Sequence, residues 1–138
     1  MKQFIQFTLG ILLSMVSIGA IVGGSTLMIS SLNESMDIMK MPIEYLDEIP
    51  LINSWFIPGL VLFSLIGIGN GWAALICFRS KHQSACLAGL ILGIILVLWI
   101  GIQILLIGYV SVLQPIFGGI GLLEIILAIF LIKFEDIK

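Results

Sequence analysis

The stretch that decides the fold is LQPIFGGIGLLEIILAIFLI, residues 113–132, an apolar run interrupted by one carboxyl group at Glu124. A central acidic residue costs about 2.5–3.5 kcal/mol to insert into a membrane, whereas each Leu, Ile or Phe returns about 0.3–0.6 kcal/mol. Twelve such residues lie between Ile116 and Ile132, so the run is predicted to insert as a helix. Inside the lipid, Glu124 must then find a partner, hold a proton or face water.

The composition of the whole chain indicates the same class of protein. Of its 138 residues, 60% are hydrophobic and 10% are charged, against about 45–50% and about 25% in soluble domains. A soluble domain of this size could not hide that excess, because much of its surface stays exposed. We therefore predict an all-α, polytopic membrane protein with a single membrane domain, residues 1–138. The few basic residues form no patch for nucleic acid.

Four apolar segments reach or approach the roughly 20 residues that cross a bilayer. They are residues 4–29, 55–78, 85–109 and 115–132. Helices are expected, because backbone groups in lipid must be paired within the segment. The second, third and fourth segments are joined by short connections, which predict a compact antiparallel bundle of four transmembrane helices.

The basic residues predict the orientation of the chain in the membrane. With four crossings, five of the six lie on the side of the two termini, namely Lys2, Arg79, Lys81, Lys133 and Lys138. Lys40 is alone on the other side. The positive-inside rule then places both termini in the cytoplasm and makes the chain a multi-pass protein of the cell membrane. Trp55 and Tyr109 are expected at the outer interface, where amphipathic rings are common.

The longest connection, residues 30–54, is predicted to lie outside and to be acidic. Its carboxylates are Glu34, Asp37, Glu44, Asp47 and Glu48. Pro42 can open a short interfacial helix that ends before Pro50, since a proline fits the first helical turn. The segment is interpreted either as a solvated spacer or as an outer docking surface for a cation, a peptide or a partner domain.

Small residues at four-residue spacing predict where the helices approach one another. The pairs are Gly19/Gly23, Gly67/Gly71, Ala85/Gly89 and Gly89/Gly93. In the third span, Ala85, Gly89, Gly93 and Gly101 lie on one ridge, which is expected to be the crowded face of the bundle.

The polar residues of the spans define a candidate intramembrane site. Glu124 shares a helix face with the small residues Gly121 and Ala128, so it is expected to point inward and, if buried from water, to be neutral at pH 7. Asn70 lies at a similar depth, and a hydrogen bond between Asn70 and Glu124 is predicted. Gln103, Trp99, Ser14 and Ser17 could complete a polar track toward Glu124. Alternatively, these residues form isolated interhelical hydrogen bonds.

No cofactor or catalytic site is expected. Cys77, Cys86 and His82 could supply three soft ligands, but structural zinc needs four. Methionines at positions 36, 39 and 41 suit copper(I) chemically, yet methionine is ordinary at an apolar edge. The spans contain no pairing of a nucleophile with a base, so the protein is not expected to be an enzyme.

Several short motifs resemble a group of small bacterial four-helix membrane proteins without an assigned function. The motifs are Ile57-Pro58-Gly59, Gly69-Asn70, Trp99-Ile100 followed by Gln103, and Leu113-Gln114-Pro115 ahead of Glu124. The resemblance covers roughly residues 55–132 and implies four spans and a bacterial inner-membrane location. It implies no activity. The chain differs from small multidrug exporters, whose functional glutamate lies in the first helix.

Two functional hypotheses follow. The first is a non-catalytic accessory or interaction protein of the bacterial inner membrane, whose partners are the lipid bilayer and either another membrane protein or a second copy in a homo-oligomer. The second is a small oligomeric transporter or proton-coupled carrier built around Glu124.

Overall fold

The computed structural model describes residues 1–33, 44, 54–79 and 82–136, without the side chains of residues 135 and 136. The helices in these residues are α1 (Lys2–Leu32), α2 (Phe56–Val61), the π-helix η3 (Leu62–Ile68), α3 (Gly69–Arg79), α4 (His82–Ile107) and α5 (Leu113–Asp136). Because α2, η3 and α3 form one continuous rod, the described residues contain four helical segments that are long and apolar enough to cross a membrane. They contain no strand. The prediction of an all-helical chain with four helices long and apolar enough to span a membrane is confirmed for these residues.

The ends of the helices follow from local sequence. Gly108 adopts a positive φ of 74°, which stops α4 two residues before the predicted end, because glycine tolerates this conformation best. At the start of α5, Pro115 lies in the first turn, where a proline leaves no helical hydrogen bond unmade. The helix therefore begins at Leu113, ahead of the predicted residue 115.

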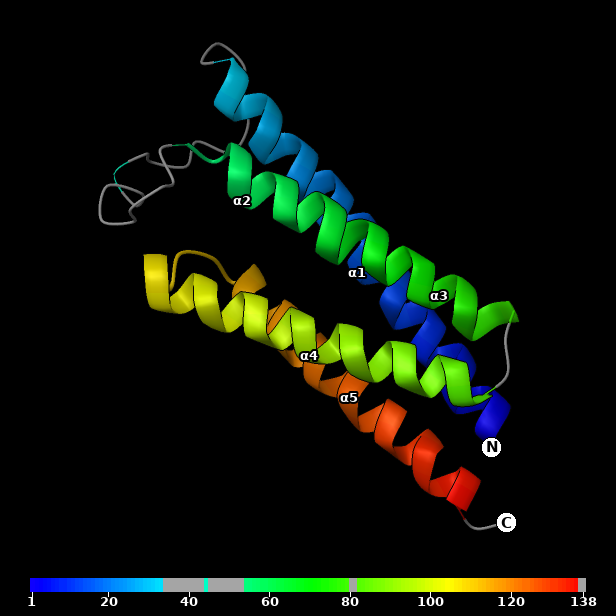
Figure 1. The fold of residues 1–138 in the computed structure, drawn as a ribbon. Coiled ribbons are helices and arrows are strands. Elements are labelled where there is room, and N and C mark those ends of the chain that lie inside the picture. Colours follow the sequence, from blue (N-terminus) through cyan, green and yellow to red (C-terminus); the bar gives the residue numbers. More distant parts are fainter. Residues whose placement is uncertain (34–43, 45–53, 80–81, 137–138) are drawn as a thin grey trace.

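The helices pack as two pairs. One pair is α1 with the rod α2–η3–α3, and the other is α4 with α5. The pairs lie closest where α1 begins and α5 ends, and they diverge toward the opposite end (Figure 1). We call these the termini end and the 108–112 end, after the short connection between α4 and α5.

Glycines set the close contacts within each pair. A Cβ built on Gly24 of α1 would lie 2.6 Å from the carbonyl oxygen of Gly59 in α2. In the other pair, a Cβ on Gly93 of α4 would lie 3.0 Å from the carbonyl oxygen of Gly121 in α5. Ala85, Gly89 and Gly93 are buried as the predicted ridge requires. Gly101 has no atom within 4 Å of its Cβ position, so its place on the crowded face was wrong, because the pairs have diverged by this level.

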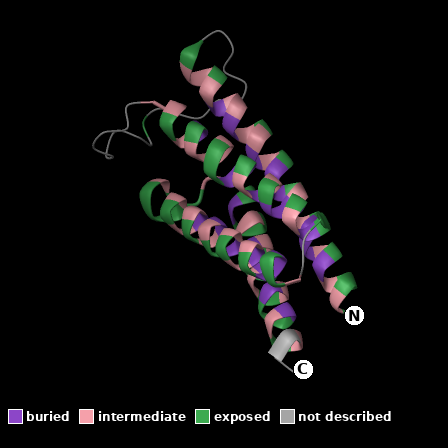
Figure 2. Ribbon diagram, turned by 45° about the vertical axis from the view of Figure 1, so that its right-hand side comes forward, coloured by how far each residue is buried: buried purple, intermediate pink, exposed green. Residues whose placement is uncertain are grey.

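Two apolar clusters fill the interior. The termini-end cluster joins all four spans and contains the buried residues Leu9, Leu13, Ala73, Ala74, Cys77, Ala85, Cys86, Ala128 and Leu131. The second cluster lies closer to the 108–112 end and contains Val16, Ala20, Ile66, Leu96 and Ile100. Exposed residues cover the outward faces of the helices (Figure 2), and many of them are large and apolar. Such an exterior suits lipid as the surrounding solvent.

The acidic connection and its predicted interfacial helix lie almost entirely outside the described residues. Glu34, Asp37, Asp47 and Glu48 are among the residues not described. Glu44 is described and exposed. The docking-surface hypothesis therefore stays a prediction.

Candidate functional site

Glu124 lies in a layer between the two apolar clusters. On α5, Phe117 and Ile120 pack on the second cluster, and Ala128 belongs to the termini-end cluster. On the rod, Asn70 falls between Ile66 of the second cluster and Ala73 of the first. Both helices thus reach this boundary with a polar residue. We call Glu124, Asn70 and the neighbouring Ser17 the central layer.

The carboxyl group of Glu124 is fully buried and has no hydrogen-bond partner. Its side chain is 0% exposed, so it points into the bundle as expected. Neither Oε1 nor Oε2 is paired. Its Cβ lies 3.1 Å from the Cβ position of Gly93 in α4, which places the acid at the glycine contact between α4 and α5.

The predicted hydrogen bond between Asn70 and Glu124 is absent. Asn70 is also 0% exposed, but its Nδ2 donates to the carbonyl oxygen of Ile66, 2.7 Å away in the preceding turn. Asparagine readily pairs with nearby backbone in this way. Its Oδ1 remains unpaired. The central layer therefore holds three unpaired oxygen atoms, two from Glu124 and one from Asn70.

Of the two predicted serines, Ser17 belongs to the central layer and Ser14 does not. Ser14 donates to the carbonyl oxygen of Gly10 in its own helix. Ser17 instead donates across the helix contact to the carbonyl oxygen of Gly67 in η3, at 2.7 Å. Gly67 and Gly71 leave the space for this side chain, since a Cβ on Gly71 would lie 2.9 Å from Ser17 Oγ.

A cavity of about 170 Å³ lies between the diverging pairs near the 108–112 end. Its wall comes from the second half of α1, Trp55 with α2 and η3, the second half of α4, and the connection with the start of α5. Most of these side chains are apolar, and none of the described residues that line it carries a charge. Glu124 and Asn70 are not among the lining residues.

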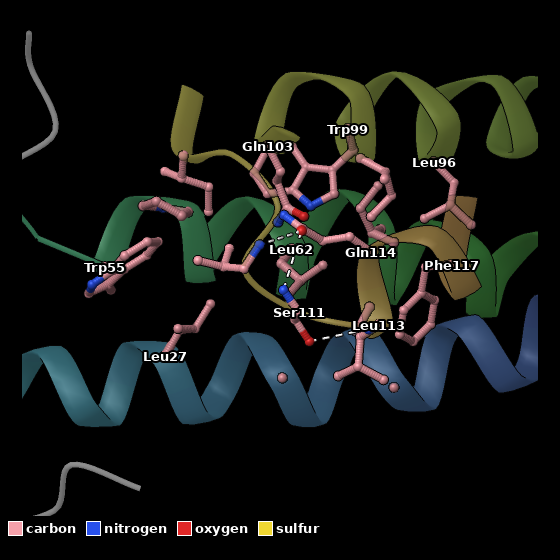
Figure 3. A pocket seen from close by; sticks show the side chains of 18 residues that line it. Leu27, Trp55, Leu62, Leu96, Trp99, Gln103, Ser111, Leu113, Gln114 and Phe117 are labelled. Carbon is pink, nitrogen blue, oxygen red and sulfur yellow. Dashed lines mark hydrogen bonds between the residues drawn. The ribbon is translucent and has the colours of Figure 1, made fainter. Parts of the chain in front are cut away.

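Polar atoms are gathered on one side of this cavity. Figure 3 shows the indole nitrogen of Trp99 turned toward the side-chain ends of Gln103 and Gln114. The indole N–H groups of Trp99 and Trp55 are both buried without a hydrogen-bond partner. Trp55 is only 8% exposed and precedes the first residue of α2, so its ring is packed within the bundle, and its predicted depth at the outer interface stays a prediction. Its ring lines the cavity because the divergence of the pairs opens space beside α2.

Gln114 holds the short connection over the cavity, a role that the sequence did not reveal. Its Oε1 accepts hydrogen bonds from the backbone N–H groups of Val110 and Ser111, and its Nε2 donates to the carbonyl oxygen of Gly108. The residue is buried. A polar residue just before Pro115 was the available signal, since backbone groups outside a helix start need partners.

At the termini end, the bundle is tied by polar contacts that the sequence also did not reveal. Gln6 of α1 is buried; its Nε2 donates to the carbonyl oxygen of Cys77, 2.6 Å away, and its Oε1 pairs with Nδ1 of His82. Cys77 and Cys86 are buried and form no disulfide. Among the described residues, no three His, Cys, Asp or Glu side chains are placed to hold a metal ion.

The predicted polar track is therefore divided into two regions. Gln103 and Trp99 line the cavity, whereas Glu124 and Asn70 lie one to two turns deeper than the nearest lining residues of their own helices, Phe117 and Ile66, in the central layer. Leu96 and Ile66 line the cavity and are almost fully buried, and each lies next to the central layer along its helix. These two side chains form the apolar floor that separates the regions.

Comparison with protein-family profiles, with curated proteins and with solved structures finds no match for this chain. The resemblance to small four-helix membrane proteins thus stays a prediction, and functional assignment depends on the two regions described above.

Proposed function

We propose that the chain is a small, non-catalytic carrier of a cell membrane, in which Glu124 takes up and releases a proton. The observation that carries the proposal is the state of this carboxyl group, which is fully buried with both oxygens unpaired. Buried polar groups that serve only the fold are nearly always hydrogen-bonded. An intramembrane acid without a partner is instead typical of ion and proton pathways.

The surroundings of Glu124 support proton exchange as its chemistry. An ionised carboxylate without a donor is very unfavourable in a dry interior, so in this conformation the group carries a proton. Opening of the layer to water would favour its release, because water stabilises the charged form. The unpaired Oδ1 of Asn70 adds a second acceptor in the same layer, which suits a site that stabilises a proton or another small cation.

The rod beside the central layer offers a structural basis for such a change. The π-helix η3 runs for seven residues, and such segments are often found at functional sites. Ile66 of this segment lines the cavity, and Gly67 accepts the hydrogen bond from Ser17. A return to α-helical geometry would rotate the rod and move both groups relative to α1.

The proposal includes the finer architecture predicted from the sequence. Contacts of Gly24 with Gly59 near one end and of Gly10 with Phe78 near the other support an antiparallel bundle. The distribution of basic residues supports cytoplasmic termini, and the resemblance to small four-helix membrane proteins supports the bacterial inner membrane. A homo-oligomer would complete a transport path for so small a chain.

The accessory hypothesis has less support. It depends on the acidic connection, of which only Glu44 is described within residues 34–53. The described residues present no specific feature that favours a protein partner over lipid.

Charge displacement after a pH jump tests the proposal without knowledge of the solute. The protein, reconstituted in liposomes on a solid-supported membrane, is expected to give a transient current as Glu124 exchanges its proton inside the membrane. Glu124→Gln should abolish the current, and Glu44→Gln, which removes an exposed carboxylate, should retain it. Equal currents from wild type and Glu124→Gln, or no current from a folded wild type, would overturn the proposal.

A further inference from the structure

We infer that the cavity near the 108–112 end binds a small neutral solute, about the size of one six-membered ring, that carries an acceptor oxygen. The site lies apart from Glu124, so the inference goes beyond the proposed proton exchange. It would stand if the carboxyl group took no part in transport.

The size of the cavity sets the size of the solute. A volume of about 170 Å³ is close to that of an engineered apolar cavity of about 150 Å³ that binds benzene. Leu27, Leu62, Leu96 and Phe117 supply apolar walls from α1, η3, α4 and α5 (Figure 3). One saturated or aromatic ring would therefore fill it.

The polar atoms set the chemistry of the solute. Trp99 presents a buried indole N–H donor without a partner on the polar side of the cavity, and an indole can only donate. Gln114 is engaged by the connection through both ends of its amide. Among the buried side-chain atoms of the described lining residues, the unpaired ones are donors and none is an acceptor, so a carbonyl, ether or hydroxyl oxygen is the complement. No lining residue among those described is charged, which favours a neutral molecule.

Trp99 is the expected contact for this oxygen. Its indole nitrogen faces the polar side of the cavity beside Gln103 in Figure 3, and no hydrogen bond joins the two side chains in the structure. A buried N–H without a partner is unfavourable. A solute oxygen that accepts a hydrogen bond from Trp99 is therefore stabilised more than the same oxygen is in lipid, where it has no donor.

Nuclear magnetic resonance of the three indole N–H groups gives a direct test. The chain has three tryptophans, and Trp72, which is 68% exposed, serves as the internal reference for unspecific partitioning. The protein in ester-free detergent is titrated with cyclohexanone and with methylenecyclohexane, which has the same number of heavy atoms but no oxygen. Cyclohexanone should move the Trp99 signal downfield in a saturable way, and methylenecyclohexane should not.

Two variants and their control sharpen the test. Gly23→Leu should abolish saturation by filling the cavity, since its Cβ position has only an ordinary contact with Leu62 at 3.5 Å. Trp99→Phe should weaken cyclohexanone binding about tenfold, followed at the Trp55 signal, because it removes one hydrogen bond. Trp72→Phe should leave the affinity unchanged.

Three results would overturn the inference: a Trp99 shift no larger than that of Trp72, equal downfield shifts with both compounds, or an unchanged saturable shift in folded Gly23→Leu. The competing occupant is the ester group of a lipid. If transfer to phospholipid nanodiscs moves the Trp99 signal and removes its response to cyclohexanone, the site belongs to lipid and the inference is wrong. The charge-displacement experiment on Glu124 is unaffected by any of these outcomes.

Discussion

The central layer and the lining of the cavity both contain buried polar atoms without hydrogen-bond partners, but these atoms are of opposite kinds. In the central layer the unpaired atoms are oxygens of Glu124 and Asn70. Among the described residues that line the cavity they are the indole nitrogens of Trp55 and Trp99. The first region therefore needs a proton or cation and the second needs an acceptor. The same bundle can serve both, because its helices converge at one level and diverge at the other.

Side-chain size explains this difference in spacing. At the central layer, Gly93 and Gly121 let the backbones of α4 and α5 touch, which leaves no room for a ligand. One to two turns further on, Trp99 and Phe117 line the cavity between the two pairs, and the ring of Phe117 lies against Gly19 of α1, with Cζ 3.0 Å from the Cβ position of that glycine. Packing against small residues drives helix association in lipid. The helices are therefore in closest contact at the level of Gly93 and Gly121, and the central layer has no space for a ligand.

The largest effect is expected when the glycine contact of the central layer is broken. In Gly93→Leu, the new Cβ would lie 2.9 Å from Ile125 Cγ1 and 3.0 Å from the carbonyl oxygen of Gly121. Backbone must move, so a loss of about 3 kcal/mol is expected, the upper end of the usual range for overpacking. Equilibrium unfolding in mixed detergent micelles measures it. Gly101→Leu, with no atom within 4 Å, should change stability by no more than about 0.5 kcal/mol; equal losses would contradict the packing.

A smaller effect is expected when the floor between the two regions is removed. Leu96→Ala should lower the free energy of unfolding by about 2 kcal/mol. This is the lower end of the range for this substitution, because a side chain exposed within a membrane meets lipid instead of water. It should also join the cavity to the central layer and speed hydrogen–deuterium exchange at Glu124. Leu98→Ala, at a position 60% exposed, should alter neither quantity. Unchanged exchange in Leu96→Ala would show that another group seals the acid.

The smallest effect concerns the two serines of α1. Ser17→Ala removes the hydrogen bond to Gly67 and should cost about 0.6 kcal/mol, the average for such bonds between membrane helices. Ser14→Ala removes only a bond within its own helix and should be silent in the same unfolding assay. A larger loss of stability in Ser14→Ala than in Ser17→Ala would contradict the assignment of the interhelical hydrogen bond to Ser17.

The sequence predicted the depth of residues in the membrane better than it predicted the partners of their hydrogen bonds. Run length and hydropathy located the four spans, and the small neighbours Gly121 and Ala128 correctly turned Glu124 inward. Asn70 was correctly placed near the level of Glu124, yet its amide pairs with Ile66 instead. Axial position follows from counting residues along a helix, whereas a hydrogen bond depends on rotamer and on local backbone pairing.

Other features of the site had no signal in the sequence. The π-helical turn of η3 shifts the facing of the residues after it, and no residue type in Leu62–Ile68 announces it. The burial of Trp55 depends on the divergence of two helix pairs, which no single segment encodes. Gly101 was misplaced for the same reason: spacing along one helix does not say where its neighbour departs.

Infrared spectroscopy of the protein in lipid bilayers at neutral pH tests the central claim most directly. A fully buried, unpaired Glu124 should give a protonated carbonyl band at the high-frequency position of an acid without hydrogen bonds. The band should disappear in Glu124→Gln and persist in Glu44→Gln. Loss of an ionised carboxylate band in Glu124→Gln, with no protonated band in the wild type, would contradict the account.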